Sequence, residues 1–318
     1  MILNRITVYG GGLIGSAWAV SFLIKGLNIT IYDLNDEKLA IAKAHVNRML
    51  NYFAEPGIDV LTTAQNVDCK TRVTYTSDVE FAVKDAEFIQ ENGPENISVK
   101  QSIIKKIEQY NSTAIIASST SGLLMSDIAA EANYPDRIVG GHPYNPVHLI
   151  PLVELVKGEK TSEEILDKTY EFYKEIGKEP VILQKECKGF ICNRIQNALN
   201  REAEDLVYRG VCTVEDVDKA VTFGPGLRWG LMGPHLVIEL GSGKAGMKDF
   251  MKRMSASSTT YEDMAKWIKV PDEYFDIADE GLKAELANRT SREGQDHDSL
   301  ERFRDDGLVH LLKYHGKL

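Results

Sequence analysis

Short runs rich in β-branched residues alternate with helical stretches through the first 185 residues of the chain. Three such runs, at residues 5–10, 28–33 and 86–92, are each followed by a longer segment without strand-like alternation. Strands that alternate with helices are typical of βαβ units, in which the strands pair in parallel and the helices cover both faces of the sheet. We therefore predict an α/β fold with a doubly wound parallel sheet of the Rossmann type for residues 1–185.

The pattern changes after Glu186. Before it, five further strands are predicted from the segments TRVTY, TAIIAS, DRIVGG, LVELV and EPVILQ. After it, beginning with GFICNRIQNALNREAEDLVYRG, apolar residues recur at helical spacing and β-branched runs disappear. This periodicity predicts a second, all-α domain at residues 186–318.

One charge lies where the hydrophobic pattern does not favour it. Glu154 stands in the middle of the predicted strand LVELV. A strand of this composition is usually buried on both faces, and a carboxylate removed from water needs a hydrogen-bonding partner to stay ionised. The sequence therefore predicts a buried polar partner for Glu154.

Composition and charge exclude several classes of partner. The chain has 318 residues and a formal net charge of −10, whereas nucleic-acid-binding proteins concentrate Lys and Arg against phosphate. No apolar run reaches the roughly 18 residues that a membrane span needs, and a strand begins too early for a signal peptide. The four cysteines contain no CxxC pair, so no metal site is predicted. We expect no nucleic-acid or membrane partner and a cytoplasmic location.

A glycine-rich turn joins the first predicted strand to the first helix. The segment GGGLIG places Gly10, Gly12 and Gly15 in a G-x-G-x-x-G pattern. In a dinucleotide-binding turn these glycines allow the tight turn, the approach of the pyrophosphate and close packing of helix on strand. Leu13 and Ile14, between the last two glycines, are predicted to contact the cofactor as well.

Asp33 ends the next strand, where a carboxylate can accept hydrogen bonds from an adenine ribose. It is followed by Leu-Asn-Asp-Glu rather than by Arg or Lys, so a 2′-phosphate would meet repulsion. NAD is therefore the predicted cofactor, in preference to NADP. Enzymes that use S-adenosylmethionine have a related turn, and SAM binding is the alternative.

Five segments together resemble the 3-hydroxyacyl-CoA dehydrogenase family over nearly the whole chain. They are GGGLIG with Asp33, PENISVK, ASSTSGL, GHPYNPVHLIPLVE and KGFICNR, in the family's order and spacing. The resemblance implies that His142 is the reacting histidine and Glu154 its partner. It also implies that Ser121 and Asn193 bind the substrate oxygen, and that Glu95 and Lys100 contact the cofactor. Taken singly, each of these residues is as typical of a turn, a cap or a surface position.

The implied chemistry suits these residue types. Oxidation of a secondary alcohol by NAD needs hydride transfer from carbon and proton transfer from oxygen. Histidine, with an ordinary pKa near 6.5, can take the proton near neutrality. A carboxylate on its far ring nitrogen fixes the tautomer and stabilises the imidazolium.

Two segments depart from the acyl-CoA pattern. NPVHLIPLVE has Pro151 where the family typically has Lys, and FGPGLRWGLMGP carries Arg228 and Trp229 in place of a shorter turn. Both resemble the branch of the family that acts on free 3-hydroxy acids, such as carnitine and L-gulonate. Arg228 could bind a substrate carboxylate and Trp229 a quaternary ammonium. Alternatively, Arg228 pairs with a nearby acid and Trp229 is packed between domains.

The function predicted from these observations is NAD-dependent oxidation of the 3-hydroxyl of a small L-3-hydroxy acid, carnitine-like or gulonate-like, to the 3-oxo acid. The resemblance also implies a homodimer formed through the helical domain. Two alternatives stay open at this point. One is a short-chain 3-hydroxyacyl-CoA dehydrogenase, and the other is a non-catalytic, crystallin-like protein that binds NAD.

Overall fold

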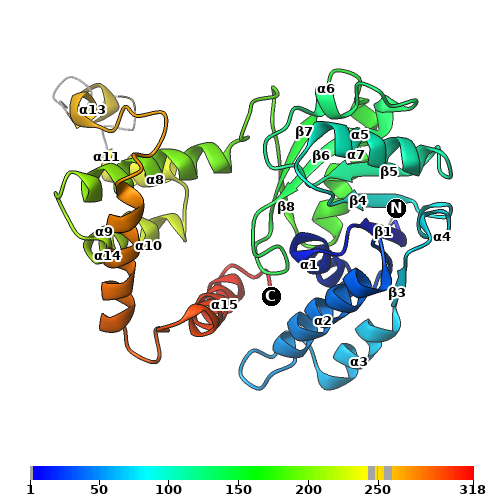
Figure 1. Ribbon diagram of the computed structural model, residues 1–318, viewed down its shortest axis with the longest axis horizontal. Helices are drawn as coiled ribbons and strands as arrows, with labels where there is room; N and C mark the ends of the chain where they lie inside the picture. Colours follow the sequence, from blue (N-terminus) through cyan, green and yellow to red (C-terminus); the bar gives the residue numbers. More distant parts are fainter. Residues whose placement is uncertain (1–2, 243–247, 249, 254–259) are drawn as a thin grey trace. The chain divides into compact units, whose positions relative to one another are not determined.

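A computed structural model describes residues 3–242, 248, 250–253 and 260–318. The chain forms two compact units (Figure 1). Unit 1 contains Met1–Asn193 together with Leu308–Leu318, and unit 2 contains Arg194–Gly307.

Unit 1 is built on one eight-stranded sheet in the order β3-β2-β1-β4-β5-β6-β7-β8. All neighbouring strands run parallel except β6 and β7. The predicted α/β class with a doubly wound sheet is confirmed. The strands are β1 (Arg5–Tyr9), β2 (Asn28–Tyr32), β3 (Val73–Thr76), β4 (Phe88–Glu91), β5 (Ile115–Ser118), β6 (Ile138–Pro143), β7 (Leu152–Lys157) and β8 (Glu179–Ile182).

The antiparallel pair β6 and β7 corrects the expectation of an all-parallel sheet. Only residues 144–151 connect the two strands. A parallel pair needs a crossover of about a dozen residues or more, whereas an antiparallel pair can be joined by a short loop. The pairing brings His142 and Glu154 directly opposite each other.

Helices cover both faces of the sheet, as predicted. Helices α1, α2, α3 and α7 pack on one face, and α4, α5 and α6 pack on the other. Helices α1 and α2 lie side by side (Figure 1). The bounds are α1 (Leu13–Leu23), α2 (Asp36–Phe53), α3 (Thr63–Thr71), α4 (Val79–Val83), α5 (Ile97–Glu108), α6 (Met125–Ile128) and α7 (Glu163–Glu175), with a 3₁₀ turn at Pro135–Arg137.

A hydrophobic core lies on each face of the sheet. Successive residues of a strand point into these two cores alternately, because side chains alternate between the faces of a sheet. In β4, Phe88 joins the core under α1 and α7, and Ile89 joins the core under α5. The same alternation continues at the polar end of the strand. Gln90 hydrogen-bonds Tyr173 of α7, and Glu91 pairs with Lys100 of α5.

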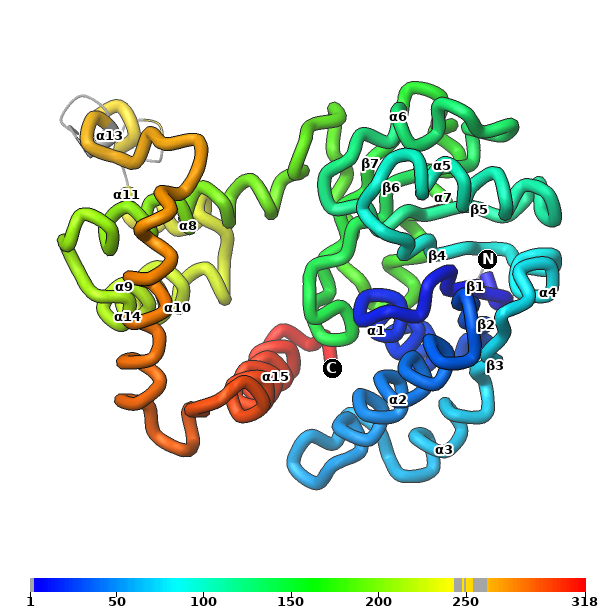
Figure 2. The backbone as a smooth tube through the Cα atoms, in the orientation of Figure 1, coloured from blue at the N-terminus to red at the C-terminus, as the bar shows by residue number. Residues whose placement is uncertain are grey.

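All regular secondary structure in the described part of unit 2 is helical, as the periodicity predicts. Helix α9 packs against α10 and α14 (Figure 2), and a side chain on Gly281 of α14 would lie 2.4 Å from Val214 Cγ2. No described helix is both long and apolar enough to cross a bilayer. The remaining helices are α8 (Cys192–Tyr208), α9 (Val214–Phe223), α10 (Pro225–Trp229), α11 (Pro234–Ser242), α13 (Thr260–Asp263), α14 (Tyr274–Asn288) and α15 (His297–Tyr314). The end of α15, from Leu308, belongs to unit 1, where Val309 and Leu312 join the core.

Candidate active site

The glycine-rich turn lies between β1 and α1, beside the point where the strand order reverses between β1 and β4. Gly10 has a φ of +95°, and a side chain on Gly15 would lie 1.9 Å from Gly10 O, so both positions require glycine. A Cβ on Gly12 would meet no atom within 4 Å. The first turn of α1, which begins at Leu13 and Ile14, carries no acidic residue. The open approach and the helix N-terminus fit a pyrophosphate.

Asp33 follows β2 and faces this turn. Its Oδ2 accepts a hydrogen bond of 2.8 Å from Gly11 N, and its Oδ1 accepts one of 2.8 Å from Leu34 N. A carboxylate has about four acceptor sites, so both oxygens can still accept from a ribose hydroxyl. The backbone amides hold the carboxylate at the position that the sequence predicts for ribose recognition.

His142 and Glu154 form a buried pair across β6 and β7. His142 Nδ1 lies 2.8 Å from Glu154 Oε2, and the two side chains are 8% and 0% exposed. The imidazole also makes an edge contact with the ring of Phe190, at 5.4 Å between centroids. Among the described residues no partner binds His142 Nε2, which is the nitrogen that a substrate hydroxyl can approach.

The second oxygen of Glu154 binds the backbone just before α8. Oε1 accepts hydrogen bonds of 2.8 Å from Ile191 N and 3.0 Å from Cys192 N. Burial acts to raise the pKa of the Glu154 carboxyl, but the hydrogen bonds from His142 and from these amides outweigh it and lower the pKa. Glu154 is therefore ionised at neutral pH, and it raises the pKa of the half-buried Cys192 thiol, with burial as the larger cause, to about 11.

A buried lysine holds the loop that connects His142 to Glu154. Lys178 Nζ donates to Val147 O and, at 3.2 Å, to Ile150 O. It also lies 5.2 Å from the ring centre of Trp18. Burial lowers the pKa of the Lys178 ammonium to about 7, with a smaller contribution from Lys25. This contact ties the β6–β7 loop to the core of unit 1.

Ser121 and Asn193 are brought together in the same network. Asn193 Nδ2 donates a hydrogen bond of 2.9 Å to Ser121 O. Because Ile191 and Cys192 bind Glu154, the segment that carries Asn193 is fixed to the His142 pair. The four predicted catalytic residues are thus linked by these hydrogen bonds and by the short backbone segment 191–193.

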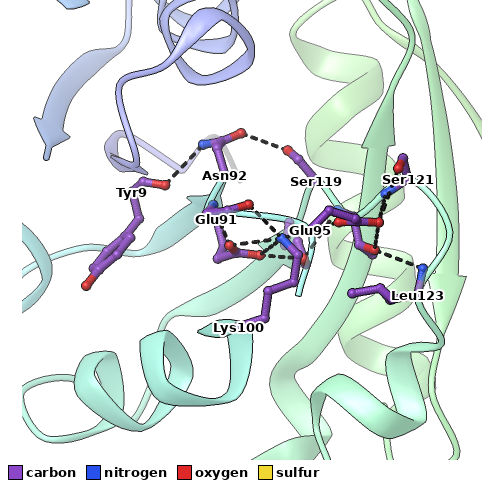
Figure 3. A network of polar contacts seen from close by, with 12 residues as sticks. Tyr9, Glu91, Asn92, Glu95, Lys100, Ser119, Ser121 and Leu123 are labelled. Carbon is purple, nitrogen blue, oxygen red and sulfur yellow. Dashed lines mark hydrogen bonds and ion pairs between the residues drawn. The ribbon is translucent and has the colours of Figure 1, made fainter. Parts of the chain in front are cut away.

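Glu95 and Lys100 lie next to this set (Figure 3). Glu95 Oε1 accepts a hydrogen bond of 2.8 Å from Ser121 N and one of 3.1 Å from Ser121 Oγ. Lys100 is 1% exposed, and its ammonium is held by Glu91 and by Gly93 O, with Glu95 Oε2 3.8 Å away. A contact between Lys100 and a cofactor stays a prediction.

Three consecutive residues at the end of β4 were not identified from the sequence as site residues. Gln90 and Asn92 both bind Ser119 Oγ, with contacts of 2.9 and 2.8 Å, while Glu91 binds Lys100. The available signal was the polar triplet QEN at the end of a buried strand. The carboxyl ends of parallel strands form the ligand-binding edge of such sheets, so a polar triplet there indicates a site.

Arg228 and Trp229 belong to unit 2, at the end of the short helix α10. The Trp229 side chain is 44% exposed, and Arg228 is also exposed. Within the described part of the chain, the Arg228 guanidinium makes no hydrogen bond or ion pair.

Comparison with known proteins gives matches over most of the chain. The model for the NAD-binding domain of 3-hydroxyacyl-CoA dehydrogenase matches residues 5–187, and the model for its C-terminal domain matches residues 189–281. L-carnitine dehydrogenase of Oceanobacillus iheyensis is 34% identical, covering 98% of this chain and 97% of its own. The protein of the same name from a Pseudomonas species is 37% identical, with coverages of 98% and 94%.

A solved structure is similar over the whole length as well. The structure of 5-formyl-3-hydroxy-2-methylpyridine 4-carboxylic acid 5-dehydrogenase, an NAD⁺-dependent dismutase, superposes with a TM-score of 0.80 at 29% identity. The match covers 99% of this chain and 98% of that chain. The similarity therefore includes the residues of both units.

Proposed function

The chain belongs to the 3-hydroxyacyl-CoA dehydrogenase family and is an NAD-dependent dehydrogenase, and we propose that it oxidises the 3-hydroxyl of a small L-3-hydroxy acid. The observation that carries the reaction is the buried His142–Glu154 pair, whose Nδ1–Oε2 distance is 2.8 Å. Full-length similarity to proteins named L-carnitine dehydrogenase supports a carnitine-like substrate.

The turn with Gly10, Gly12 and Gly15, together with Asp33, would hold NAD, which would supply the hydride acceptor for the carbinol carbon. His142 takes the proton of the substrate hydroxyl on Nε2, because Nδ1 is occupied by Glu154. The ionised Glu154 holds the Nδ1 proton and so fixes the tautomer in which Nε2 is the base. As the imidazolium forms, the adjacent negative charge stabilises it in a site from which water is largely excluded.

Ser121 and Asn193 orient the substrate oxygen in this proposal. The Asn193 amide has two N–H donors, and one is used on Ser121 O. The other can donate to the substrate oxygen and polarise the carbonyl in the reverse reaction. Ser121 Oγ lies 3.1 Å from Glu95 Oε1, so its proton must turn away from Glu95 before it can be donated to substrate.

A CoA ester is the second candidate substrate, because the matching family models are those of 3-hydroxyacyl-CoA dehydrogenase. The initial rate of NADH formation with carnitine, L-gulonate, 3-hydroxybutyrate and 3-hydroxybutyryl-CoA separates the candidates. We expect kcat/KM to be highest for a free acid. A higher kcat/KM for the CoA ester would overturn the substrate class, and no turnover of any of the four would overturn the proposed function.

Asp33 is proposed to select NAD over NADP, because its carboxylate would accept from a ribose hydroxyl and repel a 2′-phosphate. We expect wild-type kcat/KM to be clearly higher with NAD. In Asp33→Ala the ratio of kcat/KM with NAD to kcat/KM with NADP should move toward unity. The variant loses both the acceptor for the ribose hydroxyl and the charge that repels a 2′-phosphate. Steady-state kinetics with the two cofactors measure the ratio, and equal values in the wild type would remove this role from Asp33.

We also propose that the chain is divided into two domains. Matches of family models to residues 5–187 and 189–281 support an NAD-binding domain at residues 1–185 and a helical domain at 186–318.

We propose that the helical domain pairs two copies of the chain into a homodimer, because it exposes large apolar side chains, among them Phe223, Leu236 and Leu240. Sedimentation equilibrium gives the mass of the particle, and cell fractionation tests the proposed cytoplasmic location.

A further inference from the structure

Glu91 is a fully buried carboxylate at the carboxyl end of β4, with 1% exposure of its side chain. Its Oε1 accepts a hydrogen bond of 2.6 Å from Gly93 N, and its Oε2 accepts one from Ser118 Oγ of the neighbouring strand β5. Lys100 Nζ lies 3.1 Å from Oε1 and 2.9 Å from Oε2. Buried carboxylates are retained only when they are paired in this way.

Lys100 joins Glu91 to a second carboxylate. Its ammonium donates to Gly93 O at 3.2 Å, and Glu95 Oε2 lies 3.8 Å away. Two carboxylates therefore share one ammonium that is itself 1% exposed. The position of Lys100, and with it the charge that faces Glu95, depends on Glu91.

Glu95 in turn holds the loop that follows β5. Its Oε1 accepts from Thr120 Oγ1 at 2.8 Å, from Ser121 N at 2.8 Å and from Gly122 N at 3.1 Å. Figure 3 shows Glu91, Lys100, Glu95 and Ser121 in this sequence of contacts. One carboxylate oxygen thus fixes three consecutive residues of the loop.

The loop has little freedom to adjust on its other side. A side chain on Gly122 would lie 3.2 Å from Gly189 N, so the loop packs closely on the segment before α8. Asn193 also binds Ser121 O, at 2.9 Å. Although the Glu95 side chain is 40% exposed, its hydrogen bonds to Ser121 N and Gly122 N link a displacement of Glu95 to the position of Ser121.

From these contacts we infer that Glu91 is a positioning residue of the reaction, which acts through Lys100 and Glu95 to hold Ser121 against the substrate oxygen. The inference rests on the proposed role of Ser121. Replacement of Glu91 by Gln leaves Lys100 with Glu95 as its remaining carboxylate, and the ammonium is drawn toward Glu95. Glu95 then loses the geometry with which it binds Ser121 N and Gly122 N.

The variant Glu91→Gln tests this inference in the full-length enzyme. We expect kcat to fall by about a hundredfold, the size of effect that a displacement near 1 Å can have. Hydrogen exchange should show reduced protection of the amides of Ser121 and Gly122. Amide protection is read without substrate, so the inference can be judged even if the wild type oxidises no 3-hydroxy acid.

Glu108→Gln is the matched control. Glu108 is a buried carboxylate like Glu91, but it lies on α5. It accepts hydrogen bonds of 2.8 and 2.9 Å from the backbone N–H groups of Asn133 and Tyr134. It lies at the opposite end of the helix from Lys100. The control should lower the melting temperature without changing kcat or the protection of Ser121. If Glu91→Gln behaves like Glu108→Gln, Glu91 is structural and the inference is wrong.

A second variant covers the case in which Glu91→Gln does not fold. Glu91→Gln combined with Lys100→Met removes both buried charges together, which proteins tolerate better than the loss of one partner. The double variant should also lose kcat and amide protection at Ser121 and Gly122, because no ammonium then faces Glu95 Oε2. Wild-type kcat in the double variant would overturn the inference. In a Ser121→Ala background, Glu91→Gln should cost much less than it does alone, because the effect passes through Ser121.

Discussion

Replacement of His142 by Ala is expected to lower kcat by about 10²–10⁴-fold, the contribution of a positioned general base, and to leave NADH affinity nearly unchanged. His142 Nε2 is the group proposed to take the hydroxyl proton, and the imidazole is 8% exposed, so water cannot easily replace it. The glycine turn that is proposed to bind NAD lies on β1 and α1 and does not include this residue. Stopped-flow measurement of NADH formation and fluorescence titration of NADH separate the two quantities.

Glu154→Gln refines this prediction. The amide keeps an oxygen that can accept from Ile191 N and Cys192 N, but it loses the charge that stabilises the imidazolium. We expect a smaller loss of kcat than in His142→Ala, and little further loss in the double variant, because residues that act as one unit are not additive. His297→Ala, on a side chain that is 91% exposed, is the control. A double variant that loses the product of the two single effects would show that the pair does not act together.

The pairing of Glu154 shows what hydrophobic patterning can and cannot predict. Its place in the strand LVELV required a buried polar partner, and the structure supplies His142 and two backbone amides. The register that sets Glu154 opposite His142 depends on an antiparallel strand pair. The alternation of strands and helices led us to expect parallel strands throughout, although Asn145-Pro146 is a typical turn signal and the connection is too short for a parallel crossover.

The residues at the end of β4 show a different limit. The local hydrophobic pattern predicts the strand, and the polar residues at its end indicate a site. The identity of the partners could not be predicted, because Glu91 meets Ser118 and Lys100 only after β4, β5 and α5 have packed together. The family resemblance predicts that Lys100 contacts the cofactor, and it gives no sign of the ion pair with Glu91 that the structure shows. Burial of a long charged side chain is decided by tertiary packing and leaves no trace in local sequence.

Arg228→Met is expected to impair oxidation of a free 3-hydroxy acid and to leave a CoA thioester almost unaffected. Arg228 is exposed, and its guanidinium has a planar fork of donors that matches a carboxylate. A hydrogen bond to a charged group contributes about 1.5–3 kcal/mol, so kcat/KM on the best free acid should fall about tenfold to a few hundredfold. Arg228→Lys keeps the charge but loses the bidentate geometry, and it should also be strongly impaired.

The comparison that decides the role of Arg228 is between two substrates in one enzyme. A CoA thioester has no free carboxylate at the carbon where the acid has one, so 3-hydroxybutyryl-CoA should react with nearly equal kcat/KM in the wild type and in Arg228→Met. Arg209→Met is the matched control, because Arg209 pairs with Asp205 and Asp263 on the surface of unit 2, and exposed pairs contribute little. Equal losses on both substrates in Arg228→Met would mean that Arg228 supports the fold of α10 and not the binding of a carboxylate.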